Sequence, residues 1–470
     1  MSCQSGGVGI QCLAIMNKTV HIKSFGCQMN KLDTNLVAGA FARAGFEPVN
    51  EAEGADVVLI NTCSVRQHAE RKVFSLLGHL KHQKESEPGM VVAVFGCMAQ
   101  RLKSELAEHE AVNIVCGPSQ IPQLVELVAQ AITEKKDCIS VTENIRDKVD
   151  RRQSEALDDF ESTFDSAQKE TPGQAFVRVM RGCNNFCSYC IVPYVRGPEV
   201  SRTAEAIVEQ IKKLADSGAK QITLLGQTVN SYDDGSRRLA GLLEMVSEID
   251  GIEWIRFITS HPKSFDDSIF RAMADLPKVC KYLHVPAQSG SDRILKAMNR
   301  GYTSVEYLEL LDKARKIVPG IAIAGDFIVG FDGETEDDFA ATVGLVKKAQ
   351  YKNCFVFKYS PRPGTRAIAK SVETVSEEEK KRRNVELLAV QEKISAELNE
   401  SFLGQTVEVL VEGLSKKPHL NSLENGGHPQ LIGRTGTDYI VVFNGPGTLA
   451  GSFVKTKIIK TSALTLFGVL

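Results

Sequence analysis

The same pattern occurs three times near the start of the sequence: a short apolar run that suits a buried strand is followed by a cysteine. The strand-end cysteines, Cys27, Cys63 and Cys97, are separated by 36 and 34 residues, about the length of one strand and one helix. Parallel strands connected in this way bring their carboxyl ends to one edge of a sheet. The pattern therefore predicts a doubly wound parallel sheet whose three thiols gather at that edge, where they could hold an iron–sulfur cluster with one open iron.

A fourth apolar run ends at Cys116 and leaves two interpretations open. If Cys116 were a fourth ligand, the site would be closed and structural. If Cys116 is a small buried residue beside the sheet edge, one iron stays open for chemistry. We expect the second arrangement, because a reactive cluster needs the vacancy. Cys138, Cys280 and Cys354 lie in or beside apolar runs and are expected in cores.

A second group of cysteines has the spacing C-x3-C-x2-C, in a loop after the apolar run 175–180. These loop cysteines are Cys183, Cys187 and Cys190. Structural zinc usually takes four ligands from two close pairs, so three thiols favour an iron–sulfur cluster with one iron open to a substrate or cofactor. The loop resembles that of the radical S-adenosylmethionine enzymes, where the open iron chelates S-adenosylmethionine. In that resemblance Tyr189 corresponds to a residue that lies along the adenine ring.

After the cysteine loop, strand-like and helical segments alternate. With the run before Cys183 they make six βα units, which predicts an α/β core shaped as a partial (β/α)6 radical-SAM barrel. The later strand-like runs are 221–225, 254–259, 282–285, 321–329 and 353–359. Such barrels carry their chemistry on loops at the carboxyl ends of the strands.

Four residues on those loops are the predicted contacts of S-adenosylmethionine: Gly226, Gln227, Ser260 and Gln288. By resemblance to the superfamily, Gly226-Gln227 is the place that holds the amino group of the cofactor. His261, next to Ser260, is expected to be a hydrogen-bonded structural residue rather than a proton carrier.

These patterns divide the chain into five segments. They are a flexible extension at 1–16 with Met16 as the functional start, the sheet domain at 17–146, a charged linker at 147–172, the radical S-adenosylmethionine core at 173–400 and a small antiparallel barrel at 401–468. The last segment resembles the TRAM domain, an RNA-binding barrel. Its candidates for phosphate contact are Lys416, Lys417, Arg434, Lys455, Lys457 and Lys460.

Composition narrows the class of protein. The formal net charge of -2 excludes a globally basic nucleic-acid coat, so any RNA contact needs a local patch. Twelve cysteines in 470 residues are too sparse for a disulfide scaffold and suit metal chemistry in a reducing compartment. No apolar run approaches the ~20 residues of a membrane span, and the first residues make no convincing signal peptide. We therefore expect a cytoplasmic protein without a membrane partner.

Several motifs together resemble the methylthiotransferases of the radical S-adenosylmethionine superfamily. They are Gly26-Cys27-Gln28-Met29-Asn30, Asn61-Thr62-Cys63-Ser64-Val65-Arg66, Gly96-Cys97 and the loop from Arg181 to Cys190. The stretches 28–30 and 64–66 favour the branch that acts on isopentenyladenosine in tRNA. The resemblance runs from about Lys18 to the last residue, and the extension and Cys116 are its departures.

The resemblance implies an enzyme that converts N6-isopentenyl(dimethylallyl)adenosine to its 2-methylthio derivative, on the 3′ side of the anticodon, in tRNAs reading codons that begin with U. It implies S-adenosylmethionine and two 4Fe-4S clusters as cofactors, with all six cysteines as metal ligands and catalytic residues. The cluster on the strand-end cysteines would carry sulfur, which one S-adenosylmethionine methylates. A second S-adenosylmethionine would be cleaved at the loop cysteines to the 5′-deoxyadenosyl radical.

The implied partners are the tRNA anticodon stem-loop and a small reductant protein or flavodoxin-type electron donor, with the chain acting as a monomer. The alternatives are methylthiolation of threonylcarbamoyladenosine or of a ribosomal protein. From another class of protein, the chain could be an RNA-binding protein with structural clusters. Consumption of S-adenosylmethionine by the reduced protein would separate that alternative from an enzyme.

Overall fold

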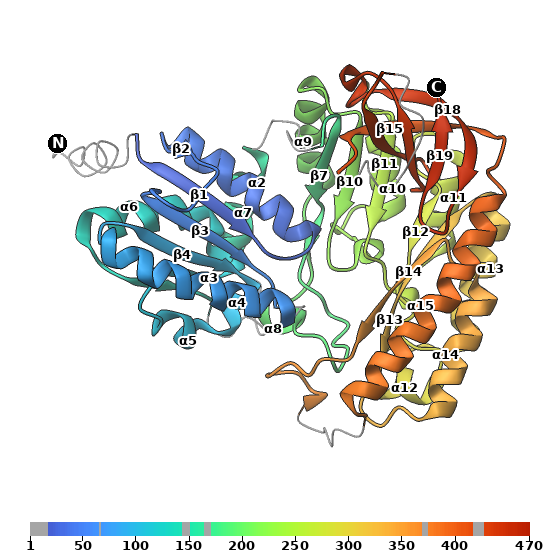
Figure 1. The fold of residues 1–470 in the computed structure, drawn as a ribbon, viewed down its shortest axis with the longest axis horizontal. Coiled ribbons are helices and arrows are strands. Elements are labelled where there is room, and N and C mark those ends of the chain that lie inside the picture. Colours follow the sequence, from blue (N-terminus) through green and yellow to red (C-terminus); the bar gives the residue numbers. More distant parts are fainter. Residues whose placement is uncertain (1–16, 65–66, 143–150, 164–170, 369–374, 417–426) are drawn as a thin grey trace. The chain divides into compact units, whose positions relative to one another are not determined.

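The structure is a computed structural model that describes residues 17–64, 67–142, 151–163, 171–368, 375–416 and 427–470 (Figure 1). The predicted extension at 1–16, Val65, Arg66 and Lys417 lie outside these residues. The chain forms two units: one holds residues 1–164, 181–184 and 190–200, and the other holds 165–180, 185–189 and 201–470. In the part of the chain so described, no helix has the length and hydropathy of a membrane span.

The first unit is built on a six-stranded parallel sheet with helices on both faces, which confirms the predicted doubly wound domain (Figure 1). The strand order is β2 (Glu47–Pro48), β1 (Thr19–Ser24), β3 (Val57–Thr62), β4 (Val91–Gly96), β5 (Ile114–Cys116) and β6 (Cys138–Ser140). One face is covered by α2 (Gln28–Arg43), the 3-10 helix η1 (Pro118–Gln123) and α6 (Leu124–Glu134). The other is covered by α3 (Gln67–Ser86), α4 (Cys97–Arg101) and α5 (Lys103–Ala107). Strands β3 and β4 are buried along their whole length, because helices cover both of their faces.

The range predicted as a linker contains a helix, α7 (Arg151–Ser162). Leu157 is buried, and Phe160 packs against the core beneath α2 and α6. The segment is so rich in charge that these two apolar residues, three apart on one helix face, gave no clear periodic signal. The same unit also holds α8 (Val192–Val195), which follows the cysteine loop.

The second unit contains six parallel strands in two three-stranded sheets, which confirms the predicted partial barrel. The strand orders are β11 (Trp254–Ile258), β10 (Gln221–Leu225), β7 (Gln174–Arg178) and β12 (Tyr282–His284), β13 (Ala322–Val329), β14 (Asn353–Lys358). The connecting helices are α9 (Ala204–Asp216), α10 (Leu239–Ser247), α11 (Asp267–Asp275), α12 (Asp292–Ala297), α13 (Ser304–Ile317), α14 (Glu336–Ala349) and α15 (Glu377–Glu400). Short elements between them are β8 (Met180–Arg181), β9 (Val200–Ser201), η2 (Val229–Ser231) and η3 (Pro262–Ser264).

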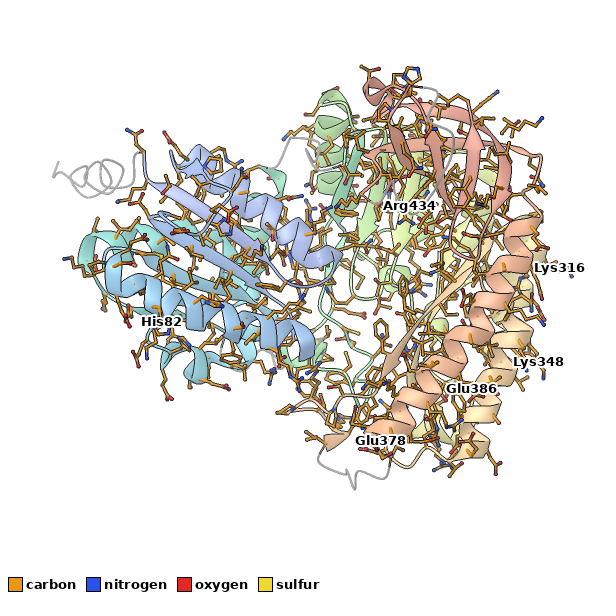
Figure 2. All side chains as sticks on the ribbon, viewed as in Figure 1. His82, Lys316, Lys348, Glu378, Glu386 and Arg434 are labelled. Carbon is orange, nitrogen blue, oxygen red and sulfur yellow. The ribbon has the colours of Figure 1, made fainter. Side chains whose placement is uncertain are left out.

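Polar residues fix where several of these helices begin. Thr303 and Thr335 each form a reciprocal capping box with the residue three positions later, Glu306 and Asp338. Ser376 accepts the backbone N–H of Glu379 at the start of α15. Exposed charged side chains then line the solvent side of α13, α14 and α15, where Figure 2 labels Lys316, Lys348, Glu378 and Glu386.

The chain ends in a closed five-stranded barrel in the order β15 (Thr406–Leu414), β16 (Gln430–Thr435), β17 (Ile440–Asn444), β19 (Leu466–Val469) and β18 (Phe453–Thr461), with η6 (Gly447–Leu449) before β18. Four of its five pairs are antiparallel, as predicted, and the pair β17–β19 is parallel. A closed ring with an odd number of strands cannot alternate direction at every pair, so one parallel pair is unavoidable.

The barrel shares a hydrophobic core with the carboxyl-terminal half of the partial barrel. A buried ion cluster adds to this contact: Asp438 accepts from Arg256 at 2.8 Å and from Lys352 at 2.8 Å. Burial alone would raise the pKa of Asp438, but Lys352, Arg434 and Arg256 hold it at about 2. The small barrel is therefore fixed to the core within this unit by apolar and charged contacts together.

Candidate active site

The strand-end cysteines lie where the direction of the sheet reverses. The chain steps outward from β1 to β2, then crosses to β3 and continues through β4, β5 and β6 on the other side. Ligands of open parallel sheets bind at the carboxyl ends of strands beside such a reversal. Cys27 directly follows the turn after β1, Cys63 follows β3, and Cys97 follows β4. The structure thus brings the three predicted ligands to neighbouring strand ends.

The thiols of Cys27 and Cys63 are hydrogen-bonded to each other, and Cys97 is near enough for its charge to interact with that of Cys27. Cys27 is exposed, whereas Cys63 and Cys97 are buried. The hydrogen bond from Cys63, with help from Arg196, lowers the pKa of Cys27 to about 6 against the desolvation of its surroundings. Burial raises the pKa of Cys97, and Arg196 opposes that rise. Thiolate is the form that binds metal, so Cys27 is ready to do so at neutral pH.

Two buried asparagines join the turns that carry Cys27 and Cys63. The side-chain amide of Asn30 donates to Oδ1 of Asn61 and to the carbonyl of Thr62, both at 2.8 Å. Asn61 Nδ2 donates back to the carbonyl of Asn30 at 2.8 Å. The turns also approach closely: a Cβ on Gly26 would lie 2.9 Å from Cβ of Cys63. This network fixes the relative positions of two strand ends.

Among the residues with described positions, no three His, Cys, Asp or Glu side chains stand close enough to hold a single metal ion. Cysteine thiolates are the ligands by which proteins hold iron–sulfur clusters. The donor set, three cysteines with one of them exposed, fits a [4Fe–4S] cluster with an iron left open.

Cys116 lies in the hydrophobic core between the sheet and α6, completely buried. Its thiol donates to the carbonyl of Gly117 at 3.6 Å. Burial, and then Cys138, raises the pKa of Cys116 well above its usual range. A neutral thiol in an apolar core is a poor metal ligand, which favours the interpretation as a small buried residue.

We expect Cys116→Ala to lower the free energy of unfolding by at most ~1 kcal/mol, because it removes one buried sulfur atom and no ligand. Iron content should stay at the wild-type level. Chemical analysis of iron in the reconstituted variant is the deciding measurement. A loss of about four irons, one whole cluster, would make Cys116 a ligand and the first cluster a closed one.

The loop cysteines are divided between the two units: Cys183 and Cys190 belong to the first and Cys187 to the second. Cys183 and Cys187 are buried and Cys190 is half-buried. In the first unit, Gly182 has a φ of +73°, and a Cβ there would overlap the carbonyl oxygen of Pro198 at 1.8 Å. Only glycine therefore fits before the first cysteine of this loop.

Within the second unit, Phe186 has a left-handed backbone with a φ of 47° directly before Cys187. The side-chain amide of Asn299 donates to the carbonyl of Phe186 at 3.0 Å. A non-glycine residue in this region is strained and persists only where its surroundings hold it. The turn after α12 thus holds the middle of the cysteine loop in place.

Arg300, one residue further, is a buried cation that sequence analysis missed. Its Nη1 donates to Sγ of Cys187 at 3.3 Å, and its Nη2 donates to the carbonyl of Pro286 at 2.8 Å. Nη1 also reaches the hydroxyl of Tyr189 at 3.5 Å. The ring of Tyr189 packs beside the cluster of Met298 and its apolar neighbours. An arginine in a polar turn has the sequence pattern of an ordinary surface cation, so no signal pointed to this role.

The carboxyl ends of the barrel strands carry buried polar atoms that have no hydrogen-bond partner among the described residues. They include Gln227 Oε1 after β10, Ser260 Oγ and His261 Nε2 after β11, and Asp332 Oδ2 after β13. Buried polar atoms are nearly always paired, so such a group suggests a polar ligand. The amino, carboxylate and ribose groups of S-adenosylmethionine offer suitable partners. Gln227 and Ser260 were predicted contacts, Asp332 lies on a strand-end loop that the sequence also pointed to, and His261 was expected to be structural.

At the other two predicted contacts, Gly226 and Gln288, the structure shows a role for the backbone. A Cβ on Gly226 would lie 2.5 Å from Cγ of Met180, so a side chain has no room there. Gln288 has a φ of 72° and donates its backbone N–H to the carbonyl of Asp326 at 2.8 Å. Both positions shape the edge of the barrel, and their contact with the cofactor stays a prediction.

His261 is held in one tautomer. Its Nδ1 accepts the backbone N–H of Lys263 at 3.3 Å, so the ring proton lies on Nε2. The backbone N–H and carbonyl of His261 both bond to the side chain of Asn230 at 2.8 Å. Burial, then Arg300 and Lys263, lowers the pKa of His261 to about 3. His261 is therefore structural, as expected, but it also presents a fixed N–H donor that a ligand could use.

The low pKa of His261 predicts a pH dependence of stability. The unfolded chain takes up a proton below about pH 6.5, whereas the folded protein resists it down to about 3. The stabilisation is complete above pH 6.5 and falls as the pH drops, by about 2 kcal/mol at pH 5. Urea unfolding followed by the fluorescence of Trp254 should show this loss in the wild type. Between neutral pH and pH 5, the free energy of unfolding of His261→Gln should fall by about 2 kcal/mol less than that of the wild type. Equal losses in both proteins would contradict the assignment.

The small barrel presents lysines to solvent. Lys455, Lys457 and Lys460 are exposed on β18, and Lys416 is exposed two residues after the end of β15. Arg434, labelled in Figure 2, is instead held by Glu412 and Asp438, each at 3.1 Å. The β18 lysines are therefore better candidates for phosphate contact than Arg434.

A partial parallel barrel with a three-cysteine loop after its first strand, joined to a second cysteine-bearing sheet and a small barrel, defines a radical S-adenosylmethionine enzyme with an additional cysteine site. The profile of the radical SAM superfamily matches residues 177–346, that of the uncharacterized protein family UPF0004 matches 19–117, and that of the TRAM domain matches 400–470.

Proteins that are similar to this chain over nearly its whole length define its family within this class. The tRNA-2-methylthio-N(6)-dimethylallyladenosine synthase of Rhodopirellula baltica is 43% identical, covering 96% of this chain and 95% of the relative. That of Caldicellulosiruptor saccharolyticus is 41% identical, covering 96% and 92%. The chain belongs to the tRNA-2-methylthio-N(6)-dimethylallyladenosine synthase family. Its cofactors are accordingly S-adenosylmethionine and 4Fe-4S clusters.

A solved structure shares the fold. The radical S-adenosylmethionine methyltransferase TsrM of Kitasatospora setae, solved with cobalamin and a [4Fe-4S] cluster, superposes with a TM-score of 0.53 at 13% identity, covering 75% of this chain and 74% of that one. At this identity the similarity concerns the fold alone.

Proposed function

We propose that this protein is a tRNA-modifying methylthiotransferase that replaces the hydrogen on carbon 2 of N6-dimethylallyladenosine by a methylthio group. The proposal is supported by two groups of three cysteines, one at the ends of β1, β3 and β4 and one in the loop after β7, in a chain 43% identical to a relative of that name over 96% of this chain. An enzyme that inserts sulfur at an unactivated C–H needs one site for sulfur and one for hydrogen removal, and two sites supply both.

The bound 4Fe-4S clusters and S-adenosylmethionine supply the sulfur, the methyl group and the radical that removes the hydrogen. The strand-end cysteines would hold one cluster and the loop cysteines the other. Gln227, Ser260 and His261 would bind polar groups of S-adenosylmethionine at the strand ends, which supplies partners for these buried atoms. Arg300 would hold Cys187 and Tyr189 in the orientation that this binding requires.

tRNA is the substrate, and the finer assignments belong to the same proposal. The anticodon stem-loop is the part bound, with the lysines of β18 contacting its phosphates. A small reductant protein or a flavodoxin-type protein delivers electrons to a monomeric, cytoplasmic enzyme. The segments at 17–146, 173–400 and 401–468 act as the sulfur-carrying, radical-generating and RNA-binding domains.

Nucleoside analysis of tRNA from cells that lack the protein tests this function. The 2-methylthio derivative of dimethylallyladenosine should be missing and dimethylallyladenosine should accumulate. The gene for the wild-type chain should restore the product, and the matched gene with the three loop cysteines replaced by alanine should not. If the 2-methylthio derivative of dimethylallyladenosine is still present and the modification of threonylcarbamoyladenosine or of a ribosomal protein is missing instead, the proposed substrate is wrong.

A further inference from the structure

Arg196 is buried beside the strand-end cysteines, although it is distant from all three in the sequence. Its side chain is only 6% exposed, in the segment of the first unit that follows α8. Nε donates to Sγ of Cys97 at 3.1 Å, and Nη2 donates to Oδ2 of Asp33 at 3.1 Å. Asp33 is on α2, the helix whose first turn begins at Cys27. The guanidinium of Arg196 therefore connects the thiol of Cys97 to α2, the helix that follows Cys27.

The segment that carries Arg196 is anchored by apolar contacts on the same cysteine. Ile191 and Val195 pack with Cys97 in one buried cluster, with Tyr194 beside them. The backbone N–H of Arg196 donates to the carbonyl of Val192 at 2.9 Å, which closes the turn of α8. The guanidinium thus reaches Cys97 from a rigid turn rather than from a loose loop.

A salt bridge alone does not account for this geometry. Asp33 would satisfy the charge of Arg196 without any sulfur, yet the Nε–H is directed at Cys97 instead. Hydrogen bonds and positive charge at cluster sulfurs are among the main determinants of the potential of an iron–sulfur site. A cation stabilises the reduced form of a cluster more than the oxidised form, because the reduced form carries one more negative charge.

We propose that Arg196 is a positioning residue of the strand-end cluster, which holds the Cys97 ligand and raises the reduction potential of that cluster. The proposal rests on the proposed function in one respect, that Cys27, Cys63 and Cys97 hold a cluster. Cys190, the last of the loop cysteines, begins the same short segment. The hydrogen bond from Arg196 to Cys97 therefore connects the segment that begins at Cys190, a proposed ligand of the loop cluster, to a proposed ligand of the strand-end cluster.

The test uses the full chain with the three loop cysteines replaced by alanine, so that only the strand-end cluster remains. In this background we compare Arg196, Arg196→Gln and Arg196→Lys by iron content and by electron paramagnetic resonance during a redox titration. At a fixed poise, the ratio of reduced to oxidised cluster should fall about tenfold in Arg196→Gln, which is 59 mV for one electron. Arg196→Lys, which keeps the charge, should recover part of the shift.

Asp33→Asn is the matched control. It breaks the same salt bridge but removes a negative charge, so its potential should move the opposite way. An unchanged potential in Arg196→Gln, or a shift of the same sign and size in Asp33→Asn, would overturn the proposal. Loss of iron from both Arg196 variants while circular dichroism stays native would limit Arg196 to holding the Cys97 ligand and would overturn the claim that it sets the potential.

The same experiment separates this inference from the proposed function. If the background protein with Arg196 intact binds no iron, the strand-end cysteines hold no cluster, and the proposed function fails first. If it binds a cluster but the enzyme acts on another substrate, the potential shift is still expected, because the titration contains no tRNA.

Discussion

Replacing Cys27, Cys63 and Cys97 together by alanine is expected to abolish the methylthio product and to leave the cleavage of S-adenosylmethionine to 5′-deoxyadenosine intact. The reason is that the predicted contacts of S-adenosylmethionine and the strand-end cysteines are carried by different strands. The unpaired atoms of Gln227 and Ser260 lie at the ends of β10 and β11, strands of a different sheet. Chromatography of the reaction for 5′-deoxyadenosine and for tRNA nucleosides measures both activities on one sample.

Cys116→Ala serves as the matched control for this triple variant, since it removes a thiol from the same sheet without removing a proposed ligand. It should keep both activities. Product formed at the wild-type rate by the triple variant would reduce the strand-end cluster to a structural element. Loss of both activities in a folded triple variant would show that the two sites are not independent.

The second large effect is expected from alanine at Cys183, Cys187 and Cys190. The anaerobically reconstituted wild type should hold about eight irons, as two clusters of the four-iron type, and this variant about four. Cleavage of S-adenosylmethionine and methylthio transfer should both vanish, because no other described thiol stands at the end of the first barrel strand. Iron analysis with an assay for 5′-deoxyadenosine measures it. A variant that retains all its iron would remove the assignment of these ligands.

The sequence was sufficient to predict the features that repeat along the chain. Apolar runs at regular intervals predicted β1, β3 and β4 and therefore the meeting of their cysteines, since parallel connections leave no other edge for them. Six βα units predicted the partial barrel for the same reason. The closed barrel at the end was predicted from short strands broken by glycine and proline, but its parallel pair follows from closure, which no local pattern contains.

The residues that sequence reasoning missed act through contacts distant in the chain. Arg196 meets Cys97 across 99 residues, and Arg300 meets Cys187 across 113. Asn30 and Asn61 stand in motifs that the sequence singled out, but their hydrogen bond across 31 residues was not predicted. Arginine and asparagine are common at surfaces and in turns, so their types gave no indication of burial. Only the fold shows that each one is enclosed beside a thiol or a cysteine-bearing turn.

The most direct test of the account is an anaerobic reaction of the reconstituted wild-type protein with S-adenosylmethionine, a chemical reductant and tRNA whose dimethylallyladenosine carries deuterium at carbon 2. The account predicts 2-methylthio-dimethylallyladenosine in the digested tRNA, together with deuterium in the 5′-deoxyadenosine. Formation of 5′-deoxyadenosine without deuterium, and with the tRNA nucleoside unchanged, would contradict the claim that this chain modifies that base.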